Sequence, residues 1–255
     1  MSELVKVEII DRIQIITINR PDVRNAINVE AARELAAALD ELDNNDQAVL
    51  GILTGAGNTF SAGMDLKAFA KGGERPYAGG RGFGGICEKP PAKPIIAAVE
   101  GYALAGGFEI VLACDLIVAA SNANFGLPEV KRGLVPGSGG LVRLPRRIPH
   151  HIAMEAILTG DMLSAQRASQ FGLVNRLVDP GQALEGALDL GRAIVRNGPL
   201  AVQTAKRIVI ESKDWREHDM FDLQRPRIAH IFVSADAKEG ATAFAEKREP
   251  VWQGK

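Results

Sequence analysis

The sequence predicts an α/β fold built from repeated ββα or βα units, followed by a helical C-terminal region. Short apolar strands in the first hundred residues are separated by a helical stretch and by glycine-rich turns, an order typical of such units. After Pro136 nearly all apolar residues recur at helical spacing instead. The chain of 255 residues is long enough to bury a core without metals or disulfides.

The first two strands form a predicted hairpin. Val5, Val7 and Ile9 alternate with polar residues, and a turn at 11–12 leads into a second apolar run at 13–18. An Arg-Pro pair follows this run. It ends the hairpin, because proline cannot continue a hydrogen-bonded ladder.

An amphipathic helix is predicted after the hairpin. Asn28 is a good N-cap residue, and apolar residues recur at helical spacing from Val29 to Leu42. Two further apolar strands, at 49–54 and 95–99, each end at a glycine-containing turn, and a helical run at 108–113 follows the second. This order repeats the strand-and-helix pattern.

The last third of the chain is predicted to be helical. A strand signal remains only at 173–178. Helices are predicted at 182–196, 200–212, 215–233 and 235–247, with a break at 197–199. We therefore expect an α/β core over residues 1–195 and a helical region over 196–255, and a helical tail with few strands to cover favours oligomerisation.

Charge and cysteine content narrow the function classes. Thirty Lys and Arg against 31 Asp and Glu give a net charge of −1, which argues against a nucleic-acid binder. Cys87 and Cys114 fit neither a disulfide framework nor a zinc spacing and indicate a reduced compartment. Residues 1–11 carry no signal-peptide core, and three carboxylates within the apolar stretch 94–120 favour a buried domain centre over a membrane span. We expect a cytoplasmic protein.

Glycine is unusually abundant, with 27 residues. Seven of them fall within residues 71–85. A long glycine-rich loop inside a compact domain is usually functional or disordered. We expect this loop to be mobile, and we expect acyl substrate to order it.

Several common catalytic motifs are missing. The four histidines are scattered, so no metal site is predicted. Ser138 has a proline where a serine nucleophile elbow requires glycine. Gly80, Gly82 and Gly85 match the spacing of a dinucleotide-binding loop but do not follow a strand, which makes the match accidental.

Two glycine-containing segments follow predicted strands closely. Residues 60–65 come after the strand at 49–54, and residues 105–109 come after the strand at 95–99 and open a helical run. Backbone N–H groups there could converge on one oxygen and stabilise an enolate or another oxyanion. The alternative is that both segments are only tight turns between core elements.

Two glutamates near these segments are candidate acid–base residues. Glu109 lies among apolar residues, and Glu129 follows a proline and precedes the glycine-rich stretch 136–140. Partly buried carboxylates beside an oxyanion site would have separated pKa values, so that one acts as an acid and the other as a base. A structural ion pair is the alternative for each.

The chain resembles the crotonase, or enoyl-CoA hydratase/isomerase, superfamily. The resemblance rests on Ser-Ala-Gly-Met-Asp-Leu-Lys at 61–67, on residues 101–109, and on Leu-Pro-Glu at 127–129 with Pro-Gly-Ser-Gly-Gly at 136–140 and Arg-Leu-Pro at 143–145. It extends from Asn-Arg-Pro at 19–21 to the C-terminal region. It implies a spiral of ββα units, a helical trimerisation region, a homotrimer or dimer of trimers, and acyl-CoA substrates with no further cofactor.

The resemblance also implies roles for individual residues. The oxyanion donors would be the backbone N–H groups of Met64 and Gly106, Glu109 would deprotonate the attacking water, Glu129 would protonate Cα, and the turn at Gly137 would help to position the water. Coenzyme A contacts would come from Arg24, Ala26, Ala62, Asp65, Leu66 and Lys67, and from Phe244 and Lys247, which would reach the adenine site of a neighbouring subunit.

The function expected from the resemblance is a hydro-lyase that adds or removes water across the α,β double bond of an acyl-CoA. Double-bond isomerisation is an alternative. Leu141 and Val142 replace the commoner Thr-Gln, and together with the C-terminal sequence this is closer to carnitinyl-CoA dehydratase. A non-catalytic scaffold that binds coenzyme A, protein or RNA is a third possibility, against which the two glutamates and the near-zero charge argue.

Overall fold

A computed structural model of the chain describes residues 3–70 and 72–255. In this described part, nine strands form two sheets. The larger sheet has six strands in the order β1-β2-β3-β4-β6-β9, and the smaller has the order β5-β7-β8. The strands are β1 (Val5–Ile10), β2 (Ile13–Ile18), β3 (Leu50–Gly55), β4 (Ile95–Val99), β5 (Tyr102–Leu104), β6 (Leu116–Ala120), β7 (Asn124–Gly126), β8 (Leu163–Ser164) and β9 (Arg176–Val178).

From β4 to β7 the chain alternates between the two sheets. Strands β1 and β2 form the predicted antiparallel hairpin, and the remaining neighbours in the large sheet are parallel. Strand β4 runs in the large sheet and the next strand, β5, runs in the small one, after which the chain enters a helix; β6 and β7 repeat this step. The expected spiral of ββα units is confirmed.

Ten α-helices are present in the described residues, and several begin where the sequence predicts. They are α1 (Val29–Asn44), α2 (Leu66–Ala70), α3 (Gly106–Ala113), α4 (Gly140–Arg143), α5 (His150–Thr159), α6 (Ala165–Gln170), α7 (Ala183–Val195), α8 (Pro199–Glu211), α9 (Met220–Phe232) and α10 (Ala235–Glu246). Asn28 caps α1 as expected, since its Oδ1 accepts a hydrogen bond from the N–H of Ala31 at 3.0 Å.

The central strands of the large sheet, β2, β3, β4 and β6, are buried on both faces. On one face, Ile13, Ile15 and Ile52 pack with residues of α7. On the other face, Ile16 and Leu53 join the main core with α1 and α3. Burial on both faces explains why these central strands are nearly continuous apolar runs in the sequence.

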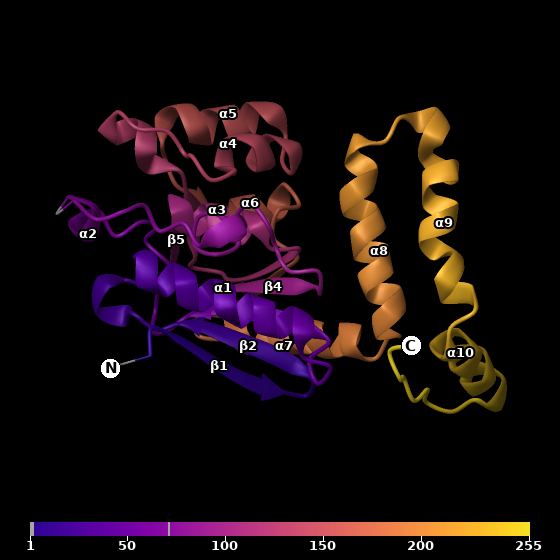
Figure 1. Ribbon diagram of the computed structural model, residues 1–255. Helices are drawn as coiled ribbons and strands as arrows, with labels where there is room; N and C mark the ends of the chain where they lie inside the picture. Colours follow the sequence, from indigo (N-terminus) through magenta and orange to yellow (C-terminus); the bar gives the residue numbers. More distant parts are fainter. Residues whose placement is uncertain (1–2, 71) are drawn as a thin grey trace.

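The C-terminal helices stand apart from the sheets. Figure 1 shows α8 and α9 as an antiparallel pair beside the core, with α10 at their lower end. Lys206 attaches α8 to the core: its Nζ lies 2.6 Å from the Asp115 carboxylate and donates to two main-chain carbonyls. Phe232 and Phe244 are 74% and 87% exposed on these helices, an arrangement that leaves apolar surface for a partner.

Two predicted boundaries need correction, and one helix contains an unexpected proline. The strand predicted at 173–178 is confined to β9, because Leu173 and Val174 are buried in the core without pairing in a sheet. The helix predicted at 215–233 begins at Met220, after a short 3₁₀ turn at Glu217–Asp219. Pro226 lies inside α9, a position that sequence reasoning overlooked.

The glycine-rich loop is more fixed than predicted. Lys71 lies outside the described residues, and residues 72–75 are exposed. Residues 81–87, however, are buried, and Arg81 is only 6% exposed and pairs with Asp40 and Asp43 at 2.7 and 3.2 Å. The expectation of a mobile loop is therefore wrong for the second half of this segment.

Within residues 3–70 and 72–255, no helix is both long and apolar enough to cross a membrane. The same residues contain no group of three or more His, Cys, Asp or Glu side chains placed to hold a metal ion.

Candidate active site

The two predicted oxyanion segments are in contact. Ile27 and Met64 form a parallel bridge, and Ser61 forms another with Ala103 in β5. Gly63 lies against the start of α3, since a Cβ at this position would be 3.0 Å from the backbone nitrogen of Gly106. The segments that carry Met64 and Gly106 therefore lie side by side.

Both N–H groups are free to bind a ligand oxygen. Phe108 and Glu109 donate their N–H groups to the carbonyl of Ala105, and neither Met64 nor Gly106 donates a backbone hydrogen bond within the described part of the chain. Gly106 is the first residue of α3, whose N-terminus carries a partial positive charge. Ala105 has φ +52° and ψ −127°, a strained conformation for a non-glycine residue.

A buried polar network fixes the Met64 segment. Ser61 Oγ donates to the carbonyl of Asn25 at 2.8 Å and accepts from the N–H of Gly63 at 3.1 Å. The Asn25 side chain, fully buried, binds Arg20, Ala56 and Thr59 through their backbone groups. The sequence did not predict this network, although Asn-Arg-Pro at 19–21 is part of the resemblance.

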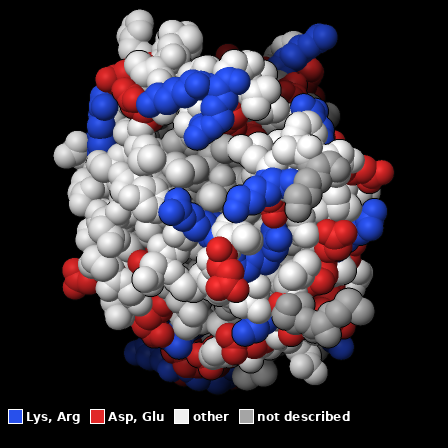
Figure 2. All heavy atoms as spheres, turned by 90° about the vertical axis from the view of Figure 1, so that its left-hand side faces the viewer, with Lys and Arg blue, Asp and Glu red and all other residues white. Residues whose placement is uncertain are grey.

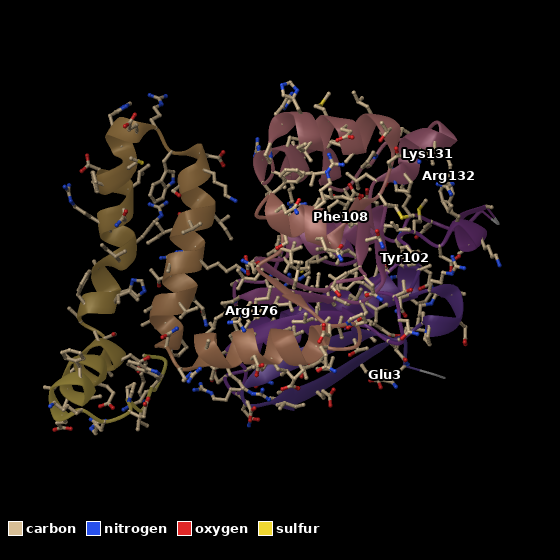
Figure 3. The ribbon with its side chains drawn as sticks, turned by 180° about the vertical axis from the view of Figure 1, so that it is seen from behind. Glu3, Tyr102, Phe108, Lys131, Arg132 and Arg176 are labelled. Atoms are coloured by element: carbon tan, nitrogen blue, oxygen red, sulfur yellow. The ribbon has the colours of Figure 1, made fainter. Side chains whose placement is uncertain are left out.

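Glu109 lies on α3 and is buried beside the 136–140 turn. Its Oε1 accepts from the N–H of Ser138 at 2.6 Å and from that of Gly140 at 2.9 Å. Burial raises the pKa of Glu109, while these hydrogen bonds and the nearby Arg143 act in the opposite direction. Phe108 anchors α3 from the neighbouring position, with its ring 5.2 Å from that of Phe125 in the core (Figure 3).

Glu129 lies in a short 3₁₀ helix, Pro128–Arg132. Its Oε2 is buried and has no hydrogen-bond partner among residues 3–70 and 72–255. Burial, together with the charge of Glu109, raises the pKa of Glu129 to about 7. The two glutamates therefore interact, and Glu129 is partly protonated near neutral pH.

Aromatic residues of the glycine-rich loop form one wall of the site. The Phe83 ring packs on Gly106, where a Cβ would come within 2.3 Å of the ring. Tyr77 stands edge-on to Phe83 at 6.2 Å, and its hydroxyl lies 3.4 Å from Ser138 Oγ. Neither aromatic residue was predicted to contribute, because a glycine-rich loop gives no sign of where it packs.

The predicted coenzyme A residues near the oxyanion segment lie together. The N–H of Ala62 donates to the carbonyl of Arg24, and the carbonyl of Ala26 accepts from Arg20. Asp65 pairs with Arg20 at 3.1 Å and caps α2; burial opposes its ionisation, but these contacts outweigh burial and lower its pKa. Leu66 and Lys67 are exposed on α2.

The remaining predicted residues are placed differently. Phe244 and Lys247 are exposed at the end of α10, which lies at the opposite side of the molecule from α2 in Figures 1 and 3. The structure therefore does not bring them to the site of their own chain. Gly137 is exposed in the turn beside Glu109, but Ser138 and Gly140 supply the N–H groups that bind this carboxylate.

Basic side chains border the end of the molecule that carries α2. Figure 2 shows this end, where Lys and Arg side chains lie on both sides of a hollow of uncharged surface. Lys131, Arg132 and Tyr102 lie at the same end (Figure 3). Ile27, Met64 and Asp65 are among the residues that line a cavity of about 400 Å³.

The ββα spiral with its helical C-terminal region defines a crotonase-fold protein, and the comparisons identify its family. The model of the enoyl-CoA hydratase/isomerase family matches residues 8–255, so the chain belongs to that family.

Named relatives cover nearly the full chain. An enoyl-CoA hydratase of Mycobacterium tuberculosis is 42% identical over 94% of this chain and 93% of its own length. A carnitinyl-CoA dehydratase of Escherichia coli K12 is also 42% identical, over 94% of both chains. The crystal structure of an enoyl-CoA hydratase from Mycobacterium marinum has a TM-score of 0.96 and 58% identity over 99% of both chains.

Proposed function

We propose that this protein is a hydro-lyase that adds or removes water across the α,β double bond of an acyl-CoA thioester. The observation that carries the proposal is the pairing of Glu109, held by two N–H groups, with Glu129, whose buried Oε2 has no partner. Two free backbone N–H donors lie on the segments beside them. The names of the relatives support the same reaction class.

In the hydration direction, the N–H groups of Met64 and Gly106 bind the thioester oxygen and stabilise the enolate. Water attacks Cβ as Glu109 accepts one of its protons, and Glu129 gives its proton to Cα. The proton gained by Glu109 equals the one lost by Glu129, and proton exchange restores both groups after product release. No cofactor beyond the coenzyme A of the substrate takes part.

The proposed coenzyme A contacts are the backbone and side chains at residues 24–26 and 62–67. Their mutual hydrogen bonds hold them as one surface beside Met64. Asp65 is engaged with Arg20, so we propose that it shapes this surface and leaves ligand contact to its neighbours. The balanced net charge supports a small-molecule substrate without a nucleic-acid partner. The two free, buried cysteines support a cytoplasmic location.

A substrate panel tests the reaction. We expect turnover of a 2-enoyl-CoA or of a 3-hydroxyacyl-CoA, carnitinyl-CoA included, and incorporation of oxygen from ¹⁸O-labelled water into the hydrated product. The enoyl-CoA hydratase and the carnitinyl-CoA dehydratase among the relatives are equally similar to this chain. The panel therefore also serves to identify the acyl group. Conversion of a 3-enoyl-CoA without label incorporation would support isomerisation instead, and saturable coenzyme A binding without any turnover would support a scaffold.

We also propose that residues 196–255 form a trimerisation region, as a trimer or a dimer of trimers. Exposed Phe232, Val233 and Phe244 on the C-terminal helices support this, and the distance of α10 from α2 in Figure 1 fits contacts of Phe244 and Lys247 with a neighbouring subunit. Sedimentation analysis should give three or six times the mass of one chain, 27.2 kDa. A monomer at micromolar concentration would contradict the proposal.

A further inference from the structure

The turn that binds Glu109 is held in place by one side chain. Arg143, at the end of α4, donates from Nη1 to the carbonyl of Ser138 at 3.3 Å and from Nη2 to the carbonyl of Cys87 at 2.5 Å. Gly139 packs on the guanidinium group, since a Cβ there would lie 2.1 Å from Nη1. Arg143 therefore joins the 136–140 turn to the buried segment that carries Phe83.

The charge of Arg143 is not neutralised by an ion pair. Its hydrogen bonds in the described part of the chain go to main-chain carbonyls, and the side chain is half-buried. Guanidinium is charged at all working pH values. A partly buried cation without a carboxylate partner interacts more strongly with a nearby titratable group than it would in water, because the effective dielectric constant is lower there.

Among the groups that face Glu109, Arg143 carries the positive charge. From the segment at 81–87 comes Cys87, whose thiol is neutral because burial raises its pKa. From the 3₁₀ helix comes Glu129, whose charge would oppose ionisation of Glu109. The turn contributes the N–H groups of Ser138 and Gly140 and the Ser138 hydroxyl, and α4 contributes Arg143.

We propose that Arg143 is a positioning residue of the reaction, which fixes the 138–140 turn against Glu109 and supplies the positive charge that keeps Glu109 ionised as the base. This role rests on the proposed function, because it assumes that Glu109 must be ionised to activate water. Arg143 itself touches neither substrate nor the reacting atoms.

The pH profile separates this role from a structural one. In Arg143→Met we expect the acid limb of kcat/KM to move about one pH unit upward, as expected for loss of a nearby opposite charge, with kcat at neutral pH falling about tenfold or more and KM changing little. In Arg143→Lys the acid limb should move part of the way back toward the wild-type pH. Lysine restores the positive charge but does not bridge the two carbonyl groups.

Arg147 provides the matched control. Arg147 is partly buried and donates to the carbonyl of Cys114 at 3.4 Å. Its charge interacts with Cys114, Arg143 and Asp115, and Glu109 is not among these groups. Arg147→Met removes the same charge without facing Glu109, and we expect its acid limb to stay at the wild-type pH. An equal shift in both Met variants, or none in Arg143→Met, would overturn the proposal.

A second measurement needs no turnover. Carboxyl groups of ¹³C-labelled glutamate can be titrated by NMR, with the Glu109 signal identified by its loss in Glu109→Gln. We expect the pKa of Glu109 to rise in Arg143→Met and not in Arg147→Met. If wild-type protein hydrates no acyl-CoA, the proposed function fails, and an unmoved Glu109 titration separately rules out the role of Arg143.

Discussion

Glu129→Gln is expected to lower kcat for hydration by roughly 10²- to 10⁴-fold, the range for loss of a positioned proton donor. The amide keeps the size of the side chain but has no proton to give to Cα. Glu109→Gln should lose activity to a similar extent, because an amide cannot accept a proton from water. Steady-state assays with 2-enoyl-CoA measure both, and full activity in both variants would contradict the mechanism.

The pH dependence assigns the acid. Because the pKa of Glu129 is about 7, hydration by wild-type protein should decline as the pH rises through this value and the acid loses its proton.

The raised pKa of Glu129 also affects the stability of the folded protein. Between pH 4.5 and about 7 the folded state holds a proton that the unfolded state releases, so stability falls as the pH rises. The glutamine in Glu129→Gln does not ionise, so this variant does not lose stability in that way. Its Tm relative to that of wild type should therefore increase from pH 5 to pH 8.

The sequence predicted the fold because several local signals agree. The hairpin, the Asn28 cap of α1 and strand β4 lie where period and capping predict them. Strand β6 was not predicted, because it continues an apolar run from α3, and period alone does not separate a buried strand from a buried helix. Strands of two or three residues, such as β8, have too few positions to show a period at all.

The contacts between distant segments could not be read from the chain. Glu109 meets Ser138 and Gly140 across about thirty residues, and Ser61 meets Asn25 across 36. Such contacts depend on how the spiral stacks its units, which local propensity does not encode. The burial of residues 81–87 is of the same kind, since glycines that allow flexibility also allow close packing.

Gly63→Ala is expected to remove most of the oxyanion stabilisation, with kcat/KM falling by roughly 10²- to 10³-fold, the range for loss of one donor. Gly63 has φ +91°, and a Cβ would lie 2.8 Å from the carbonyl oxygen of Leu104 and 3.0 Å from the nitrogen of Gly106. These neighbours are backbone atoms and cannot rotate away. The strand of residues 61–64 must therefore move outward, which carries the Met64 N–H away from that of Gly106.

Gly57→Ala separates this displacement from the general strain of a positive φ. Gly57 has φ +75°, but a Cβ there would meet only Pro21 Cβ, at an ordinary 3.7 Å. Both variants should lose about 1–3 kcal/mol of stability for placing alanine in a left-handed conformation, measured by urea unfolding. Only Gly63→Ala should also lose catalysis in the folded state. Activity of folded Gly63→Ala within a few-fold of that of Gly57→Ala would show that the Met64 N–H is not an oxyanion donor, because the clash acts on that group before any other part of the site.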